Sequence, residues 1–357
     1  MRKLKVGLVG ITRGGSYGEL VSRHPRTEVA VVCDINEKNL EQAGKEFKLK
    51  DKYLFKDYDA FINGDIDIVF IGSPLPFHSD QSIKALENNK HVLSEVTAAN
   101  SIEECEALFR AAMKSKAKYM MAENCCYFHF IREFENLIKK GKIGETYYME
   151  GEYVHQLRDR IYNKETGEVY WRINRPPLHY CSHSLGPLLM FLENDYIVKA
   201  TGSGKKANII PNLGPGAINM QVALFETKKG VIIKLLRSSV VSREPLLGFY
   251  SVYGTKGFLE TGREGYDTKG RIYFEDEDKE AREVDCFMSD PNAPEETKTG
   301  GHGTSEYYLL QDFINCIDNN TKPPIDIVKA LEMTIPGIIA HQAVIKGNVW
   351  FDVPHFE

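Results

Sequence analysis

The N-terminal segment combines a buried strand, a glycine-rich turn and a helix, and it constrains the fold more than any other stretch. The apolar run Leu4–Gly10 stops at glycine, and Gly15 and Gly18 follow before a helical pattern begins. Glycine lets the backbone approach a pyrophosphate, and free N–H groups at a helix start stabilise its charge. The strict GxGxxG motif is absent, with Thr12 at the second glycine's place, so a plain tight turn stays open. We expect a dinucleotide beside Gly10 and Gly15, and a helix that begins after Gly18.

The second strand indicates which dinucleotide is bound. Val29–Cys33 is a continuous apolar run that ends in Asp34. A carboxylate at the end of this strand accepts hydrogen bonds from both ribose hydroxyls, and it repels a 2′-phosphate. The sequence therefore predicts NAD rather than NADP, while a plain loop acid is the alternative for Asp34.

The alternation of strands and helices continues and predicts a parallel sheet. Buried strands are expected at 67–72, 91–94 and 118–122, with helices between them. Ligands bind at the carboxyl edge of such a sheet, where the Ser73–His78 loop, Glu95 and the Glu123–Tyr127 segment (ENCCY) fall. We expect a Rossmann-type, doubly wound NAD-binding domain over residues 1–124.

The second half has a different pattern, which predicts an α+β domain over residues 125–357 with a large, mainly antiparallel open sheet. Strand-like runs separated by glycine turns fill residues 198–285. Residues 275–299 read as a solvated loop, and a helix is expected over 304–319. A last helix, over 325–346, would be kinked at Pro336, and these helices are expected to pack back on the first domain.

Histidine and tyrosine supply the candidate acid/base groups of the second half. Tyr153 and His155 lie two apart in a predicted strand, and therefore on the same face. Tyr180 and His183 lie three apart and share a face if that turn is helical. A structural histidine is the alternative for His183 alone. A metal site at 179–183 lacks a fourth ligand, so we expect no metal.

Composition excludes several other functions. The chain has 357 residues and a net charge of −5, which argues against binding to nucleic acid. Its seven cysteines form no CxxC pair, so neither a disulfide framework nor a structural zinc site is predicted. No run of about 18 apolar residues occurs, and we expect a cytoplasmic protein without membrane contact.

Several motifs together resemble the Gfo/Idh/MocA family of NAD(P)-dependent sugar oxidoreductases. They are the glycine turn, CDIN at 33–36, the SPxxxH loop at 73–78 and HVLSE at 91–95. The family usually has a catalytic lysine after the glutamate, but Val96 stands here. The strings EVTAA, ENCCY, GEYVHQLRD and YxxHSLGP, with the late GGHG, resemble the glycoside hydrolase family 109 branch of NAD-dependent redox glycosidases.

The resemblance implies a mechanism and a set of residues. Hydride would leave carbon 3 of a sugar in the cleft between the domains and later return to it, while the aglycone leaves by elimination and water adds. Tyr153, Arg172, Tyr180 and His183 would contact the sugar, His155 would act in proton transfer, and Glu123 would orient a catalytic group. The resemblance places these residues at the cofactor: Thr12, Arg13, Asp34, Leu75, His78, Glu95, Val96 and Asn124, and Ser73 lies in the same loop.

The sequence also departs from the family near the substrate. Ser184 replaces a glycine, Cys181-Ser182 replace proline and threonine, and Thr304 follows GGHG in place of a further glycine. These changes leave the sugar, its anomer and its aglycone open. A sugar or polyol dehydrogenase and a non-catalytic NAD sensor remain alternatives, His302 is a candidate lid residue, and the resemblance implies a homo-oligomer (dimer or tetramer).

Overall fold

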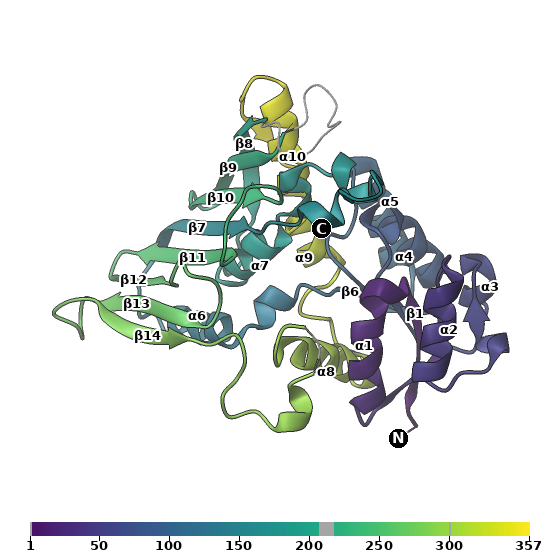
Figure 1. The fold of residues 1–357 in the computed structure, drawn as a ribbon. Coiled ribbons are helices and arrows are strands. Elements are labelled where there is room, and N and C mark those ends of the chain that lie inside the picture. The colour runs from purple at the N-terminus through teal and green to yellow at the C-terminus, as the bar shows by residue number, and fades with distance from the viewer. Residues whose placement is uncertain (1, 207–217, 300) are drawn as a thin grey trace. The chain divides into compact units, whose positions relative to one another are not determined.

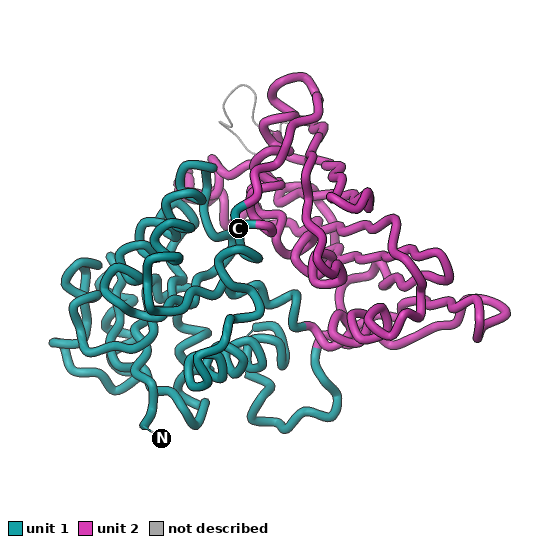
Figure 2. The backbone as a smooth tube through the Cα atoms, turned by 180° about the vertical axis from the view of Figure 1, so that it is seen from behind, with its two compact units in different colours: residues 1–127, 289–331, 356–357 teal, residues 128–288, 332–355 magenta. Residues whose placement is uncertain are grey.

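The computed structural model describes residues 2–206, 218–299 and 301–357. The chain forms two compact units (Figure 2): unit 1 comprises residues 1–127, 289–331 and 356–357, and unit 2 comprises 128–288 and 332–355. Gly300 of the predicted glycine loop and residues 207–217 of the predicted strand region lie outside the described residues.

Unit 1 contains the predicted Rossmann-type sheet. Its six strands are all parallel and run in the order β3-β2-β1-β4-β5-β6. Figure 1 labels two of them, β1 and β6. The central strand β4 is buried along its whole length, as expected for a parallel sheet covered by helices on its faces. The strands are β1 (Leu4–Val9), β2 (Thr27–Cys33), β3 (Leu54–Phe55), β4 (Ile68–Ile71), β5 (His91–Ser94) and β6 (Tyr119–Met121).

Helices connect these strands, and a later segment adds one more helix to unit 1. The connecting helices are α1 (Ile11–Arg23), α2 (Glu37–Glu46), α3 (Tyr58–Ile62), α4 (His78–Glu87) and α5 (Ile102–Lys114), and α8 (Ser305–Asp318) is the late addition. Ser101 caps α5 by accepting the N–H of Glu104 at 3.2 Å.

The prediction that a helix begins after Gly18 was wrong. Helix α1 begins at Ile11, directly after Gly10, so Gly14, Gly15 and Gly18 lie inside it. A Cβ on Gly18 would lie 2.2 Å from Cζ of Phe47, and one on Gly14 would lie 3.4 Å from the carbonyl oxygen of Val9. These two glycines therefore allow close packing of the helix rather than forming a turn.

Unit 2 is built on a nine-stranded sheet in the order β14-β13-β12-β11-β7-β10-β9-β8-β15. The pairing is antiparallel except between β7 and β10, which confirms the predicted, mainly antiparallel sheet. The strands are β7 (Thr146–Val154), β8 (Ile197–Lys205), β9 (Met220–Thr227), β10 (Ile232–Ser238), β11 (Leu247–Gly254), β12 (Gly257–Glu260), β13 (Thr268–Phe274), β14 (Arg282–Cys286) and β15 (Phe351–Asp352).

Helices pack on one face of this sheet. They are α6 (His129–Lys139), α7 (Ser182–Met190) and α10 (Ile335–Ile345) (Figure 1). A Cβ on Gly151 of β7 would lie 2.6 Å from the carbonyl oxygen of Ser184 in α7, and one on Gly202 of β8 would lie 3.0 Å from that of Ala340 in α10. Small residues on the strands therefore let both helix backbones approach the sheet.

Two further predictions for the second half were wrong. Strand β14 lies within the predicted loop 275–299, because it forms a hairpin with β13. The predicted single helix over 325–346 is two helices, α9 (Ile327–Glu332) and α10, and Pro336 lies in the first turn of α10. Proline is favoured there because the first turn needs no backbone donor.

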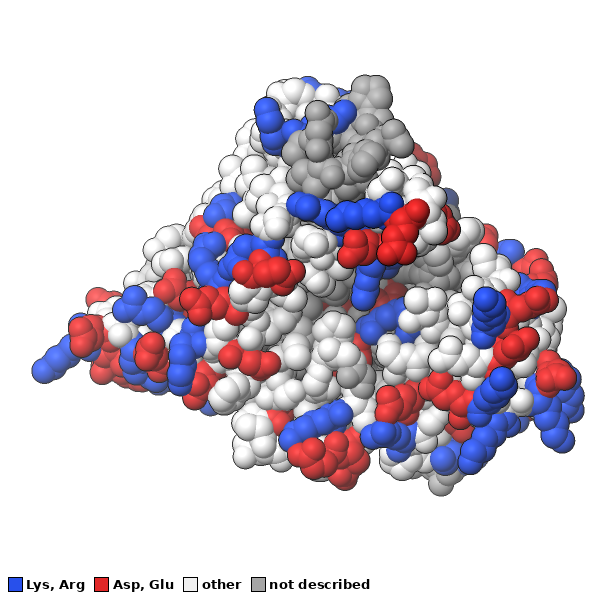
Figure 3. Space-filling view, viewed as in Figure 1, with Lys and Arg blue, Asp and Glu red and all other residues white. Residues whose placement is uncertain are grey.

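Charged side chains of both signs cover the hairpin of β13 and β14 (Figure 3). Lys269 pairs with Asp285, and Arg282 Nε lies 3.2 Å from an oxygen of Asp278. Charges on an outer strand oppose edge-to-edge pairing with another chain. None of the described helices is long and apolar enough to cross a membrane.

Candidate active site

The turn between β1 and α1 is as tight as a pyrophosphate site requires. Gly10 has φ +74°, and a Cβ on it would lie 2.6 Å from the backbone nitrogen of Ser73. No side chain at Gly10 caps the helix, while the N–H of Ile11 donates to Oδ2 of Asp34 at 2.8 Å. Arg13 and Gly14 donate their N–H groups to the carbonyl of Gly10, at 3.2 and 2.8 Å, so the N–H of Thr12 is the one at the start of α1 that has no partner among the described residues.

Asp34 stands at the end of β2, where the sequence predicts a ribose-binding acid. Its Oδ1 accepts the N–H of Asn36 at 2.8 Å, and its Oδ2 accepts from Nδ2 of Asn39 at 3.1 Å. These donors, with that of Ile11, hold the carboxylate in one orientation. No arginine from the described residues lies within ion-pair distance of Asp34.

The Ser73–His78 loop is fixed by its histidine. His78 is buried, its Nδ1 lies 2.9 Å from the carbonyl oxygen of Thr97, and its Nε2 lies 2.8 Å from that of Ser73. Burial lowers the pKa of His78 despite these acceptors. Leu75 is buried in the short 3-10 helix Leu75–Phe77 of the same loop.

An ion-pair network at α1 joins three segments of unit 1. Nε of Arg13 lies 2.6 Å from Glu95 Oε1, and its Nη2 lies 2.6 Å from Glu306 Oε1. Glu306 is fully buried and also meets Nδ1 of His302 at 2.9 Å and the N–H of Gly301 at 3.1 Å. Burial by itself raises the pKa of Glu306. Contacts with His302 and Arg13 lower this pKa by more than burial raises it, so the net shift is downward.

Glu306 was missed by the sequence reasoning. It lies in α8, far along the chain from Arg13, and no local motif connects the two. His302, which the sequence leaves as a candidate lid residue, contacts this buried carboxylate.

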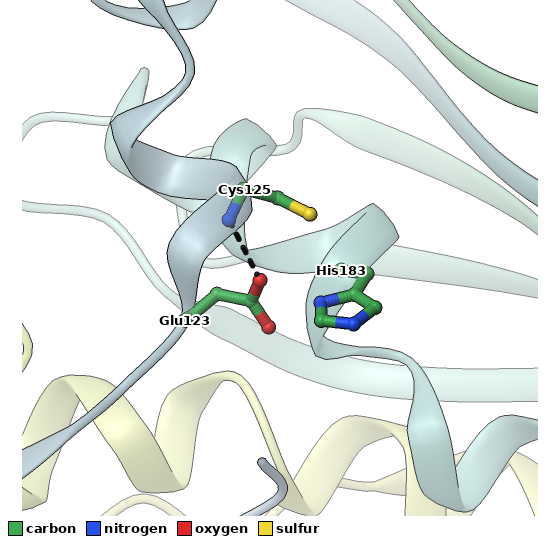
Figure 4. Close-up of side chains that lie close together, drawn as sticks. All are labelled: Glu123, Cys125 and His183. Carbon is green, nitrogen blue, oxygen red and sulfur yellow. Dashed lines mark hydrogen bonds between the residues drawn. The ribbon is translucent and has the colours of Figure 1, made fainter. Parts of the chain in front are cut away.

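The segment after β6 brings two predicted residues to the same sheet edge. Oε1 of Glu123 accepts the N–H of Cys125 at 3.1 Å (Figure 4). The side chain of Asn124 is buried, and its Nδ2 has no hydrogen-bond partner among the described residues. At the end of β5, the N–H of Val96 donates to Glu95 Oε2 at 3.2 Å. The orphaned amide of Asn124 is suited to donate to a ligand at this edge.

In unit 2 the predicted pair Tyr153 and His155 meets at the end of β7. The phenol oxygen of Tyr153 lies 3.0 Å from Nδ1 of His155. Burial is the main cause that lowers the pKa of His155, and the positive charge of Arg237 lowers it further. His155 therefore stays neutral to a lower pH than an ordinary histidine.

Tyr180 and His183 form a second pair of the same composition. Tyr180 ends the 3-10 helix Pro177–Tyr180, and His183 lies in the first turn of α7 (Figure 4). The phenol oxygen of Tyr180 lies 3.0 Å from Nε2 of His183, and the rings of Tyr153 and His183 are 5.4 Å apart. The hydroxyl of Tyr250 donates to the backbone carbonyl of His183 at 2.6 Å and thereby fixes the start of α7.

Three arginines surround these pairs, and sequence reasoning found only Arg172. Its guanidinium carbon lies 4.5 Å from the ring centroid of Trp171. Arg175 lies 4.1 Å from the ring of Tyr180, and Arg237 lies 4.6 Å from that of Tyr153. The signal for Arg237 was present in the sequence, because it follows Ile233 and Leu235 at alternate positions of β10 that are all buried.

Two family models match the chain. The model described as the oxidoreductase family with an NAD-binding Rossmann fold matches residues 4–123. The model described as the C-terminal domain of glycosyl hydrolase 109 matches residues 191–357. Residues 4–123 thus carry the NAD-binding domain of the Gfo/Idh/MocA oxidoreductase family. Within it, the chain resembles the glycoside hydrolase family 109 branch, as its motifs indicate.

Curated relatives agree with this assignment over nearly the whole chain. A glycosyl hydrolase family 109 protein of Solibacter usitatus is 28% identical, over 99% of this chain and 88% of its own length. An α-N-acetylgalactosaminidase of Bacteroides fragilis is 27% identical, over 92% of this chain and 86% of its own length.

Solved structures share the fold. A levoglucosan dehydrogenase in complex with NADH and L-sorbose has a TM-score of 0.86 at 17% identity, with all of both chains covered. An oxidoreductase domain protein of Kribbella flavida has a TM-score of 0.84 at 18% identity, over 99% of this chain and all of that one.

The cofactor of this protein is NAD, and the chain is an NAD-dependent enzyme. The geometry of unit 1 fits that cofactor. Gly10 lets the turn before α1 pack against the backbone of Gly72 and Ser73, where a Cβ would clash, Asp34 offers a carboxylate to the ribose, and Asn124 holds an unused buried donor.

Proposed function

We propose that this enzyme is an NAD-dependent glycosidase that cleaves a sugar glycoside by transient oxidation at carbon 3, elimination, water addition and re-reduction. The observation that carries the proposal is the pair of tyrosine–histidine contacts in unit 2, each with 3.0 Å between phenol oxygen and ring nitrogen. A single hydride transfer needs one proton acceptor, whereas this cycle moves protons at several positions and needs several such groups.

NAD, when bound, supplies the chemistry of hydride removal and return at carbon 3. The protein must then hold the sugar and move protons. A carbonyl at carbon 3 makes the proton on carbon 2 acidic, so a base can remove it while the aglycone leaves from carbon 1. Water then adds at carbon 1, and carbon 2 regains a proton.

The residues divide these tasks between them. His183 and Tyr180 take up and return the hydroxyl proton of carbon 3, since their mutual contact lets a proton pass between phenol and imidazole. Tyr153 and His155 serve the proton on carbon 2 and the leaving group. Arg172 contacts the sugar, and Glu123 orients a catalytic group from its position after β6.

The lowered pKa of His155 suits a base. Burial and the charge of Arg237 disfavour its protonated form, so the neutral imidazole is available in mildly acidic solution. Its contact with Tyr153 gives the phenol a proton acceptor at hydrogen-bond distance.

The proposed division of labour follows the chain. Residues 1–124 bind NAD, and residues 125–357 bind the sugar and mediate assembly. Gly10, Thr12, Arg13 and Gly15 belong to the pyrophosphate turn and its helix, and Asp34 binds the adenosine ribose. The nicotinamide half is bound by the later loops, through Ser73, Leu75, His78, Glu95, Val96 and Asn124.

The relatives support a glycoside substrate, since the Bacteroides fragilis protein is named an α-N-acetylgalactosaminidase. The departures at Cys181, Ser182 and Ser184 leave the sugar itself to experiment. The missing lysine after Glu95, where Val96 stands, disfavours the dehydrogenase alternative.

The test uses the NAD-loaded enzyme with panels of α- and β-nitrophenyl glycosides in D₂O. Nitrophenol release without accumulating NADH, together with deuterium at carbon 2 of the product sugar, is the expected result. Direct hydrolysis would leave carbon 2 undeuterated and would contradict the proposal. NADH that accumulates with free sugars, without nitrophenol release, would establish a dehydrogenase instead.

The open face of the sheet in unit 2 supports a homo-oligomer. Tyr148, Tyr253, Phe258 and Tyr273 stack across four strands of it, with ring centroids 6.0, 5.8 and 6.3 Å apart in that order. We expect two copies to pack through this aromatic row, because its four residues are only partly buried and lie side by side, and contiguous apolar area that reaches the surface marks interaction sites. Light scattering should give a dimer or tetramer that Phe258→Glu dissociates, and a monomeric wild type would contradict it.

A further inference from the structure

Three arginines converge around Tyr180 in unit 2, and no carboxylate of the described residues lies within ion-pair distance of any of them. The guanidinium carbons of Arg175 and Arg237 lie 4.1 and 5.3 Å from the centroid of the Tyr180 ring. Arg172 and Arg175 both lie on the ring of Trp171, at 4.5 and 5.4 Å. By contrast, the partly buried Arg13 of unit 1 has two acidic partners, Glu95 and Glu306.

Arg237 is the most enclosed of the three. Only 1% of the residue is exposed, although its side chain carries a full charge. Its Nε donates to the carbonyl of Tyr180 at 3.1 Å, and its Nη1 donates to the carbonyls of Tyr153, at 3.2 Å, and Ser238. Its Nη2 is buried and has no hydrogen-bond partner in the described residues. One charged donor beside the two tyrosines is therefore unused.

Burial lowers the pKa of all three arginines, and for Arg175 the two neighbouring arginines lower it further. The pKa of Arg175 is lowered to about 9, first by burial and then by Arg237 and Arg172, with only phenols acting in the opposite direction. Burial also lowers the pKa of Arg237 and of Arg172. Glu244 is the one carboxylate that acts on the neighbouring His155, where Arg237 and Arg160 oppose it.

Burial of cations without counter-charge is costly, because desolvation is not offset by attraction. Arg237 is buried and Arg172 and Arg175 are partly buried, so the three together are complementary to an anion. The planar fork of arginine suits carboxylate, sulfate and phosphate in particular. Folded proteins concentrate such uncompensated charge where a ligand supplies the missing partner.

We propose that this arginine cluster, Arg172, Arg175 and Arg237, binds an anionic substituent of the substrate, so that the enzyme acts on acidic sugars. The anion is a carboxylate, a sulfate ester or a phosphate ester on the sugar ring. The inference rests on the proposed function in that it places the sugar beside Tyr153 and Tyr180. It goes beyond that function because it fixes the charge of the sugar.

The first test measures binding without turnover. Isothermal titration calorimetry on the NAD-loaded enzyme compares glucose with glucuronic acid, glucose 6-sulfate and glucose 6-phosphate. We expect at least one acidic sugar to bind about tenfold or more tightly than glucose, and the best of the three names the anion. Equal or weaker binding of all three acidic sugars would overturn the proposal.

The second test assigns the binding to the cluster. Arg175→Met keeps much of the side-chain length and removes the charge, and we expect it to weaken binding of the acidic sugar about tenfold to a hundredfold and to leave glucose binding nearly unchanged. Arg132→Met, on the surface of α6, is the matched control. Because Arg237→Met removes a buried residue with structural hydrogen bonds, only Arg175→Met decides the result. Equal effects of Arg175→Met on glucose and acidic sugar would contradict the proposal.

Turnover separates this inference from the proposed function. Nitrophenyl glycosides of the best acidic sugar are compared with their neutral counterparts. If the enzyme binds the acidic sugar but cleaves no glycoside, the proposed glycosidase activity is contradicted and the proposed anion site is supported. If the enzyme cleaves neutral glycosides and prefers acidic ones neither in binding nor in rate, the proposed anion site is contradicted and the proposed glycosidase activity is supported.

Discussion

The phenol oxygen of Tyr180 lies 3.0 Å from Nε2 of His183, and the two residues come from different elements, a 3-10 helix and the first turn of α7. Arg175 lies over the ring of Tyr180, with its guanidinium carbon 4.1 Å from the ring centroid. In the proposed function, the contact between Tyr180 and His183 is the one that passes a proton between phenol and imidazole.

Tyr180→Phe removes the hydroxyl and keeps the ring. We expect kcat to fall by roughly 10²- to 10⁴-fold, because a positioned acid/base group is lost, with little change in melting temperature. Steady-state kinetics on the best glycoside and a thermal melt measure the two effects. Tyr196→Phe, at a tyrosine that stacks on His355, is the control and should keep wild-type kcat. Equal kcat in Tyr180→Phe and wild type would exclude Tyr180 from proton transfer.

Gly10→Ala tests the turn before α1. Alanine is strained at φ +74°, and its Cβ would lie 2.6 Å from the nitrogen of Ser73, so we expect weaker NAD binding and lower stability by about 1–2 kcal/mol. Gly15→Ala is the matched change inside α1, where the nearest atom to a Cβ is Ile11 Cγ2 at 3.8 Å. It should raise the free energy of unfolding by about 0.5–1 kcal/mol. Similar losses of stability in both variants would contradict the helix start at Ile11.

Glu306→Gln removes the charge of a carboxylate that is fully buried beside Arg13 and His302. Since Arg13 keeps Glu95, we expect a loss of about 3 kcal/mol in unfolding free energy, at the low end for a broken buried pair, and weaker NAD binding. Denaturant titration and NAD fluorescence quenching measure these. Glu295→Gln breaks the exposed pair with Lys298 and should change stability by less than about 0.5 kcal/mol. A Glu306→Gln variant with wild-type stability and NAD binding would show that the network does not hold the start of α1.

Because the pKa of His179 is lowered by folding, we expect the free energy of unfolding to fall in acid. Burial, and then the charges of His341 and Arg175, lower its pKa to about 3, while an unfolded histidine titrates near 6.5. Between these values the unfolded chain binds more protons, so stability falls as pH drops below about 6.5. The slope from this one group is about 1.4 kcal/mol per pH unit.

Chemical denaturation at several pH values between 7 and 5 measures that slope. His179→Gln keeps a polar side chain without a titrating ring, and its stability should fall less steeply with acid than that of the wild type. The difference in slope is the readout, so a uniform loss of stability in the variant does not affect it. Parallel curves for both proteins would show that His179 is not the group responsible.

The sequence alone determined the fold class and the cofactor, because both depend on patterns that are local in the chain. Apolar runs and single residues predict one strand that ends at Gly10 and another that ends at Asp34. Strand-like runs separated by glycine turns predict the second sheet. The pairs Tyr153–His155 and Tyr180–His183 were found for the same reason, since two or three residues separate their members and the local geometry sets which face they share.

Only the tertiary structure decided where α1 begins and which charges remain without partners. In the sequence, Gly18 indicates a turn, yet it lies inside a helix. Phe47 and Leu8 pack in the space that a side chain at this position would fill, and this explains why a glycine stands in the helix. Glu306 reaches Arg13, and Arg237 reaches Tyr153, across many residues of chain. Such contacts depend on how sheets and helices pack, and that packing leaves the arginine cluster without a carboxylate, which no local pattern records.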